Sequence, residues 1–242
     1  MFNDFNLSKT EFKAYLECPL KFYLIKSQNY NLPLGPRGRR DYSQFSSEKQ
    51  EGMYWHYWFM DFYKTYKEDI KTGAPAPTDE LPHKTFIMTA FYQLELKRFR
   101  DNPHFWCPLA TELYLQSEYY RGTLDRIDLL NTQGDSRVVE YKARPGVFDR
   151  DELLFYALLL SQKLADEELL QSVTAVKEIA VYYYRLGEFQ AERITLKDLQ
   201  LFEQRLQTII EEIFQPNWVR KEGCDGHNKD CSYSCICKNI PL

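Results

Sequence analysis

The chain has 242 residues, with 31 Lys and Arg against 35 Asp and Glu, so its formal net charge is −4 at pH 7. Apolar residues make up 44% and aromatic residues 16%, which excludes an intrinsically disordered protein and suffices for a sizeable core. The longest apolar run, Leu153 to Leu160, is far shorter than the ~20 residues of a membrane helix, and the N-terminus does not resemble a secretory signal. We therefore expect a cytoplasmic protein in which any contact with nucleic acid uses a local basic patch.

The first half of the chain has helical patterns. Ser8 and Glu11 form a capping box, which predicts a helix that starts there and breaks or restarts at Pro19. The segment 31–41 contains two Pro, two Gly and three Arg, which predicts a basic loop. Two further helices are expected over 47–70, which is strongly aromatic between 54 and 63, and over 84–100, with a Pro-rich connector between them.

The second half changes to strands that alternate with helices. Turn residues at 131–135 predict a hairpin between two strands that are rich in β-forming residues. Thr195 is expected to cap the last helix. The expected strands are 112–120, 121–130, 136–143, 178–185 and 189–194, and the expected helices are 151–170 and 195–214. This order predicts an α/β domain with a central mixed sheet flanked by helices.

Three charged residues in the strands suggest chemistry. Because side chains alternate along a strand, Glu140 and Lys142 share one face while Tyr141 points away, and Asp125 on the neighbouring strand can approach Glu140. Two carboxylates and a lysine at one place suit a hard divalent cation and metal-assisted phosphodiester hydrolysis. On the spacing alone, a solvated strand face with a Glu/Lys pair is the favoured interpretation. These strands are otherwise apolar, however, so the charges need a reason.

The cysteines are unevenly distributed. Four of the six lie within the last nineteen residues, Cys18 lies near the start, and Cys107 is isolated and expected to pack as a small hydrophobe. A reducing compartment disfavours disulfides, so the terminal cysteines indicate a metal site. Thiolate ligands permit either a 4Fe–4S cluster or Zn²⁺, and His227 leaves a Cys/His zinc site open.

These segments together resemble a known family. GTLDRID at 122–128 and VVEYK at 138–142 resemble the PD-(D/E)XK nuclease superfamily, specifically its RecB-like branch. GMYWH, which ends at His56, resembles the upstream helix motif of that branch, and ELLFY at 152–156 resembles its Q-x-x-x-Y motif with Glu152 in place of Gln. The early and late cysteines resemble the arrangement that holds a 4Fe–4S cluster in the fourth of the CRISPR-associated Cas proteins and in AddB-type helicase-nucleases. The resemblance spans nearly the whole chain, in the motif order of the family.

The resemblance implies a site for Mg²⁺ or Mn²⁺. Its implied ligands are His56, Asp125, Glu140 and the carbonyl of Tyr141, with Glu112 as a second-tier candidate. Lys142 would position the nucleophilic water or stabilise the transition state, and Tyr156 would contact a DNA phosphate or support Lys142. The role of Glu152 stays open, because an ionised Glu cannot donate the hydrogen bond that a Gln donates. Core packing is the alternative for His56 and Tyr156.

The resemblance also implies a restriction-endonuclease-like core with a cysteine-rich appendage formed by the N- and C-terminal segments. We expect a nuclease domain over 1–215 and a cluster segment over 216–242 that packs with the Cys18 region. The preferred cluster ligands are Cys18, Cys224, Cys231 and Cys237, with Cys235 as a spare thiol within reach. The usual late spacing in the iron–sulfur relatives is C-x2-C-x5-C, whereas six residues separate the first two late cysteines here.

The sequence therefore predicts a metal-dependent DNA exonuclease that acts on single strands. Its implied setting is CRISPR adaptation with integrase proteins, or recombination and repair with a helicase. Two alternatives stay open: a nuclease-fold protein that holds DNA ends with weak or no cleavage, and a zinc-stapled domain without nuclease activity. The expected DNA contacts are Arg37, Arg39 and Arg40, with Lys97, Arg98 and Arg100 as a second cluster, and solvated surface charge is the alternative for both groups.

Overall fold

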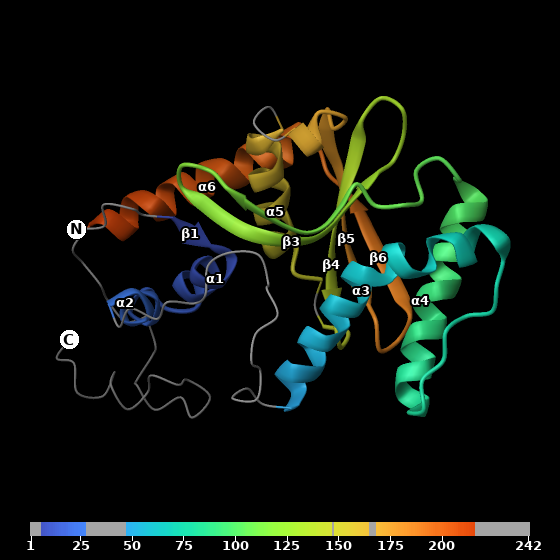
Figure 1. The fold of residues 1–242 in the computed structure, drawn as a ribbon. Helices are drawn as coiled ribbons and strands as arrows, with labels where there is room; N and C mark the ends of the chain where they lie inside the picture. Colours follow the sequence, from blue (N-terminus) through green and yellow to red (C-terminus); the bar gives the residue numbers. More distant parts are fainter. Residues whose placement is uncertain (1–5, 28–46, 147, 165–167, 216–242) are drawn as a thin grey trace.

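The computed structural model describes residues 6–27, 47–146, 148–164 and 168–215 (Figure 1). Its helices are α1 (Lys9–Glu17), α2 (Pro19–Ser27), α3 (Ser47–Thr72), α4 (Pro82–Asp101), α5 (Arg150–Lys163) and α6 (Leu196–Phe214), with a 3-10 turn at Glu168–Leu170. Its strands are β1 (Leu7–Ser8), β2 (Ala110–Gln116), β3 (Tyr120–Leu129), β4 (Asp135–Lys142), β5 (Ala175–Tyr183) and β6 (Glu188–Arg193).

The strands of the described residues form one mixed sheet, as the sequence predicts. The order is β1-β3-β4-β5-β6, and β2 pairs with the other edge of β3. The β1–β3 and β4–β5 pairs are parallel, and the remaining pairs are antiparallel. Along one edge of β3 the partner changes from β4, at 126–129, to β1, at 120–121. The sheet is therefore forked between these two pairings.

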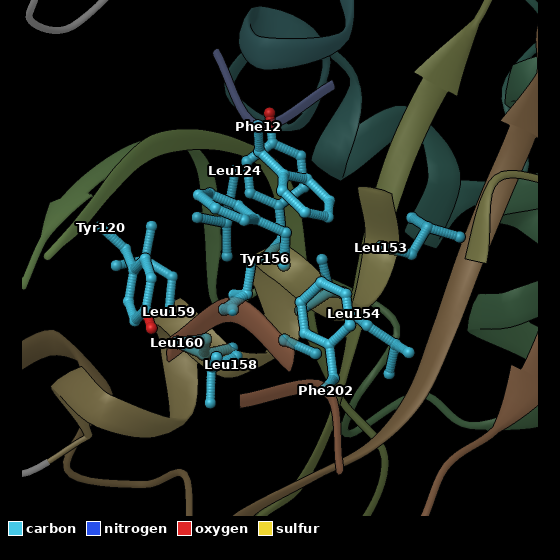
Figure 2. Close-up of a cluster of buried hydrophobic side chains, with 14 of the residues drawn as sticks. Phe12, Tyr120, Leu124, Leu153, Leu154, Tyr156, Leu158, Leu159, Leu160 and Phe202 are labelled. Carbon is cyan, nitrogen blue, oxygen red and sulfur yellow. The ribbon is translucent and has the colours of Figure 1, made fainter. Parts of the chain in front are cut away.

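Helices cover both faces of the sheet (Figure 1). On one face, Phe12 of α1 stacks on Phe155 of α5 at 5.8 Å between ring centroids and meets Phe202 of α6 edge-on. Figure 2 shows this apolar cluster, in which Leu124 and Tyr156 also take part. Burial of these large side chains is the main force that holds α1, α5 and α6 on the sheet.

On the opposite face, α3 and α4 pack through aromatic rings. Phe59 lies 4.6 Å from Phe91 and 4.5 Å from Tyr141 between ring centroids, and Trp55 and Phe62 are fully buried beside them. The aromatic run between 54 and 63 therefore contributes mainly to the core. None of the helices in the described ranges is both long and apolar enough to span a bilayer.

The local start signals of the sequence are confirmed. The capping boxes at Ser8 and Thr195 are both present and open α1 and α6. The helix expected over 151–170 is shorter, because α5 ends at Lys163 and a separate 3-10 turn follows. The two-residue strand β1 is an addition to the expected elements, since so short a strand leaves no alternating pattern to read.

Candidate active site

Three carboxylates lie side by side on neighbouring strands. Glu112 of β2 lies opposite Asp125 of β3, and the same antiparallel register places Glu140 of β4 one position beyond the last β3–β4 pair, opposite Asp125. The flanking pairs that fix this alignment are Thr111–Arg126, Leu113–Leu124 and Arg126–Val139. All three carboxylate residues are at most 9% exposed. Strand register therefore gathers three acidic groups at one buried place, as the spacing predicts for Asp125 and Glu140.

The backbone of Glu112 is unusual. Its φ is 50°, in the left-handed region that residues with a Cβ rarely adopt. This conformation interrupts the regular pairing of β2 with β3 opposite Asp125. Strained backbone of this kind costs about 1–3 kcal/mol and tends to persist at functional sites. Here it coincides with a side chain that contacts the imidazole of His56.

His56 reaches the carboxylates from helix α3. Its Nδ1 lies 2.9 Å from Oε1 of Glu112 and 3.3 Å from Oδ1 of Asp125. Ligand atoms of these three residues lie within 4.8 Å of one another, a spacing at which a single cation could contact all three. The ring of His56 also meets the buried ring of Tyr141 edge-on at 5.8 Å, which fixes the approach of α3 to the sheet.

The donor set fits a hard divalent cation. Oε2 of Glu140 is buried and has no hydrogen-bond partner among the described residues. Burial raises the pKa of Glu140 above its ordinary range, because it removes water from the charged carboxylate. The negative charge of Asp125 raises this pKa further, because the two anions repel each other. Carboxylate oxygens with one imidazole are ligands that Mg²⁺ and Mn²⁺ accept. A cation at this point would relieve the repulsion.

Lysines lie on the other side of Glu140. Nζ of Lys142 lies 3.3 Å from Oε1 of Glu140, and Nζ of Lys9 lies 2.8 Å from the same oxygen. A cavity of about 140 Å³ opens beside Lys142, and its charged lining is Lys13, Lys142 and Arg144 together with Glu140, Asp149 and Glu152. The site thus places a buried acidic cluster next to an opening with three cationic side chains, which can contact an anionic substrate such as a phosphodiester.

A family comparison agrees with this geometry. The model of the PD-(D/E)XK nuclease superfamily matches residues 6–238. The chain belongs to the PD-(D/E)XK nuclease superfamily. No curated protein matches the chain. Membership explains why an acidic cluster and a lysine occupy the central strands of this sheet, and it implies a nucleic-acid substrate.

Glu152 is a charged acceptor in this member of the superfamily. Its carboxylate is buried, with Oε1 2.5 Å from Nζ of Lys9 and 2.6 Å from Nζ of Lys142, and Oε2 3.1 Å from Nζ of Lys13. Burial alone would raise its pKa, but the charges and hydrogen bonds of Lys9 and Lys142 outweigh burial and lower the pKa to about 2. Glu152 is therefore ionised at neutral pH and holds Lys142 by accepting its hydrogen bond.

Tyr156 belongs to both the core and the site. It is 3% exposed within the apolar cluster of Figure 2, and Nζ of Lys9 lies 4.8 Å from its ring centroid. Burial, and then the charge of Glu140, raise the pKa of Tyr156, so the phenol is neutral at pH 7. The side chain of Tyr156 supports Lys9 rather than Lys142 directly.

Three further residues named from the sequence, Cys18, Cys107 and Arg98, lie within the described residues. Cys18 directly follows the last residue of α1 and is partly exposed. Cys107 packs at the margin of the α3–α4 core, as expected. Arg98 is held by ion pairs with buried Glu95 and Asp128, which makes it a structural residue rather than a phosphate contact. The predicted residues Arg37, Arg39, Arg40, Cys224, Cys231, Cys235 and Cys237 lie outside the described residues.

Lys9 and Lys13 are site residues that sequence reasoning missed. Both lie on α1, more than 130 positions from the glutamates that they contact. A usable signal was present at Lys9, because a lysine at the first position of a helix opposes the helix dipole and needs a compensating anion.

Proposed function

We propose that the chain is a divalent-metal-dependent deoxyribonuclease that hydrolyses phosphodiester bonds. The observation that carries this proposal is the buried cluster of His56, Glu112, Asp125 and Glu140 directly beside Lys142. Such a cluster is costly for stability, because it brings like charges together in a place of low dielectric. Hydrolysis of a phosphodiester with a bound cation is a chemistry that uses all of these groups.

Each residue has a distinct role in this proposal. The side chains of His56, Glu112, Asp125 and Glu140, with the carbonyl of Tyr141, would hold Mg²⁺ or Mn²⁺. The bound ion supplies Lewis-acid activation of a phosphoryl oxygen and of water. Lys142 orients the attacking water or stabilises the charge that develops on the phosphate, and Glu152 fixes the ammonium group of Lys142 through their 2.6 Å contact.

The substrate preference we propose is single-stranded DNA, cleaved from an end, with the segment that contains Arg37, Arg39 and Arg40 contacting phosphates. This finer assignment rests on the resemblance to RecB-like exonucleases. It carries with it a role in CRISPR adaptation, or in recombination and repair. A DNA-end-binding protein without cleavage is the alternative, and the ionised Glu152 in place of a Gln is the feature that favours it.

A 4Fe–4S cluster held by Cys18, Cys224, Cys231 and Cys237 completes the proposal. It rests on the resemblance and on the four cysteines within the last nineteen residues. Cys18 directly follows α1, whose first residue reaches the active site. A cluster there would fix the helix that carries Lys9 and Lys13. Protein purified without oxygen would be brown and absorb near ~400 nm if thiolate-bound iron is present. Colourless protein with one zinc per chain would favour the zinc alternative.

The nuclease proposal is tested with end-labelled DNA. The purified chain should shorten single-stranded DNA stepwise in Mn²⁺ or Mg²⁺, and a chelator should stop the reaction. Glu140→Ala should abolish the reaction and Lys142→Ala should slow it at least ~100-fold, while Lys64→Ala, at an exposed position of α3, should leave it unchanged. Full activity in both site variants would contradict the proposal. Tight binding without cleavage across several divalent ions would favour the end-binding alternative.

A further inference from the structure

Lys9 is rigidly placed by its surroundings. It is the first residue of α1, directly after β1, which pairs with β3 at Tyr120 and Arg121. The N-cap hydroxyl of Ser8 accepts from the amide of Glu11, and Glu11 in turn pairs with Arg121. With Phe12 buried against α5 and α6, the backbone of Lys9 has little freedom, and the reach of its side chain is set by the fold.

The ammonium group of Lys9 occupies a position suited to a cation. Its Nζ lies 2.8 Å from Oε1 of Glu140 and 2.5 Å from Oε1 of Glu152, with the ring face of Tyr156 at 4.8 Å. The side chain is only 18% exposed. Burial of a lysine is costly, and so is a positive charge at the start of a helix. The two glutamates offset both costs, so Lys9 and this glutamate pair depend on each other.

The charges divide the site into two halves. In one half, the carboxylates of Glu140, Glu152 and Asp149 face the ammonium groups of Lys9, Lys142 and Lys13, and this half is balanced. The other half contains Glu112, Asp125 and His56, and Oε2 of Glu140 is buried next to it without a hydrogen-bond partner among the described residues. A dication is attracted to the second half. In the first half it would meet two ammonium groups bound to the same oxygens.

We propose that Lys9 is a built-in cation that holds the Glu140–Glu152 pair in place of a second divalent ion, so the site takes one metal ion per chain. This inference rests on the proposed function, because it assumes that the acidic cluster binds a metal. It makes Lys9 a positioning residue that fixes the number of ions. When Lys9 is replaced by an uncharged residue, the carboxylates of Glu140 and Glu152 lose this shared cation, and a second divalent ion can bridge them.

The test counts Mn²⁺ ions on the full chain by calorimetry and by electron paramagnetic resonance. We expect one ion on the wild-type chain, with the spectrum of an isolated Mn²⁺. Lys9→Met should bind two ions, with the broadened spectrum of a coupled pair, whereas Lys9→Arg, which keeps the charge, should bind one. Lys13→Met is the matched control, because it also removes an ammonium group from Glu152. Lys9 stays between the two glutamates in this variant, so the count should remain at one.

The outcomes separate the two proposals. Two ions on the wild-type chain, or one ion on a folded Lys9→Met variant, overturn the role of Lys9 and leave the nuclease proposal intact. Absence of any bound ion on the wild-type chain overturns both. If Lys9→Met does not fold, the wild-type count and spectrum still decide, because a coupled pair in the native protein contradicts a built-in cation.

Discussion

The backbone amide of Tyr141 donates a hydrogen bond of 2.8 Å to Oδ2 of Asp125. This bond takes the place of a ladder bond at the point where β3 and β4 stop pairing. The sheet therefore holds the carboxylate of Asp125 in one orientation, which preorganises it for binding a cation. A substitution that keeps the acceptor oxygen can remove the negative charge of this side chain without moving the backbone.

Asp125→Asn should separate activity from stability. The amide oxygen of Asn can still accept from Tyr141, but the charge needed for the cation is lost, so we expect nuclease activity to fall at least ~100-fold. Because one of several clustered like charges is removed, the melting temperature without metal should stay equal or rise. Nuclease assays and thermal unfolding in a chelator measure both. A large loss of stability would show that Asp125 serves folding instead.

Lys142→Met should lower kcat by about 10²–10³-fold and change KM little, because the ammonium group acts on charge that develops during the reaction. Lys142→Arg should recover part of the activity. Single-turnover cleavage at saturating Mn²⁺ isolates the chemical step. The prediction is wrong if Lys142→Met changes KM alone, since the residue would then bind substrate without assisting the reaction.

Glu152→Gln tests the lysine network. Three ammonium groups contact this carboxylate, and its neutral replacement leaves the buried Lys9 with Glu140 as its anionic partner in the network. We expect a loss of about 2 kcal/mol in the free energy of unfolding. Urea unfolding measures it. Glu211→Gln, at an exposed position of α6, is the control and should cost less than about 0.5 kcal/mol.

Glu95 should make stability depend on pH. It is fully buried beside Arg126 and Arg98, and burial raises its pKa from 4.5 to about 7. The folded state thus holds the proton more strongly than the unfolded state. The contribution to stability is complete below pH 4.5 and is lost as the pH rises to 7, by at most about 3 kcal/mol. Urea unfolding from pH 4.5 to 7.5 should show a flatter profile for Glu95→Gln, and parallel profiles would contradict this.

Gly122→Ala tests the packing behind the site. A Cβ at this position would lie 2.9 Å from Cε1 of Tyr156, so the ring must move, and with it the surface that supports Lys9. We expect a loss of about 1–3 kcal/mol from overpacking. Combination with Tyr156→Leu, which removes the clashing ring, should recover part of that loss. Strictly additive losses in the double variant would show that the two positions are independent.

The central strands were predictable because strand geometry has a short period. Alternation alone places Glu140 and Lys142 on one face and buries Tyr141 on the other, and the hairpin turn brings Asp125 opposite. The helices that start at Ser8 and Thr195 were equally legible, since capping depends on residues three positions apart. These features depend on local contacts that a sequence displays directly.

The convergence of Lys9, Lys13 and Lys142 on Glu152 was not predictable in the same way. It requires α1 and α5 to pack on one face through Phe12 and Phe155, which no local pattern encodes. The left-handed backbone of Glu112 is similar, because it follows from the fit between β2 and β3 rather than from the residue. Tertiary packing therefore decides the charge balance of the site, and with it the ionisation of the Glu152 carboxylate.

The fork in the sheet makes room for side chains. Residues 122–125 lie where β3 has parted from β4 and has not yet met β1, so along this edge the backbone of β3 pairs with neither strand. Side chains occupy this gap instead: the carboxylate of Asp125 accepts from the amide of Tyr141, and the ammonium group of Lys9 reaches Glu140. An interruption in the ladder thus becomes the place where polar groups from three elements meet, and a sheet that paired without interruption would leave no space for them.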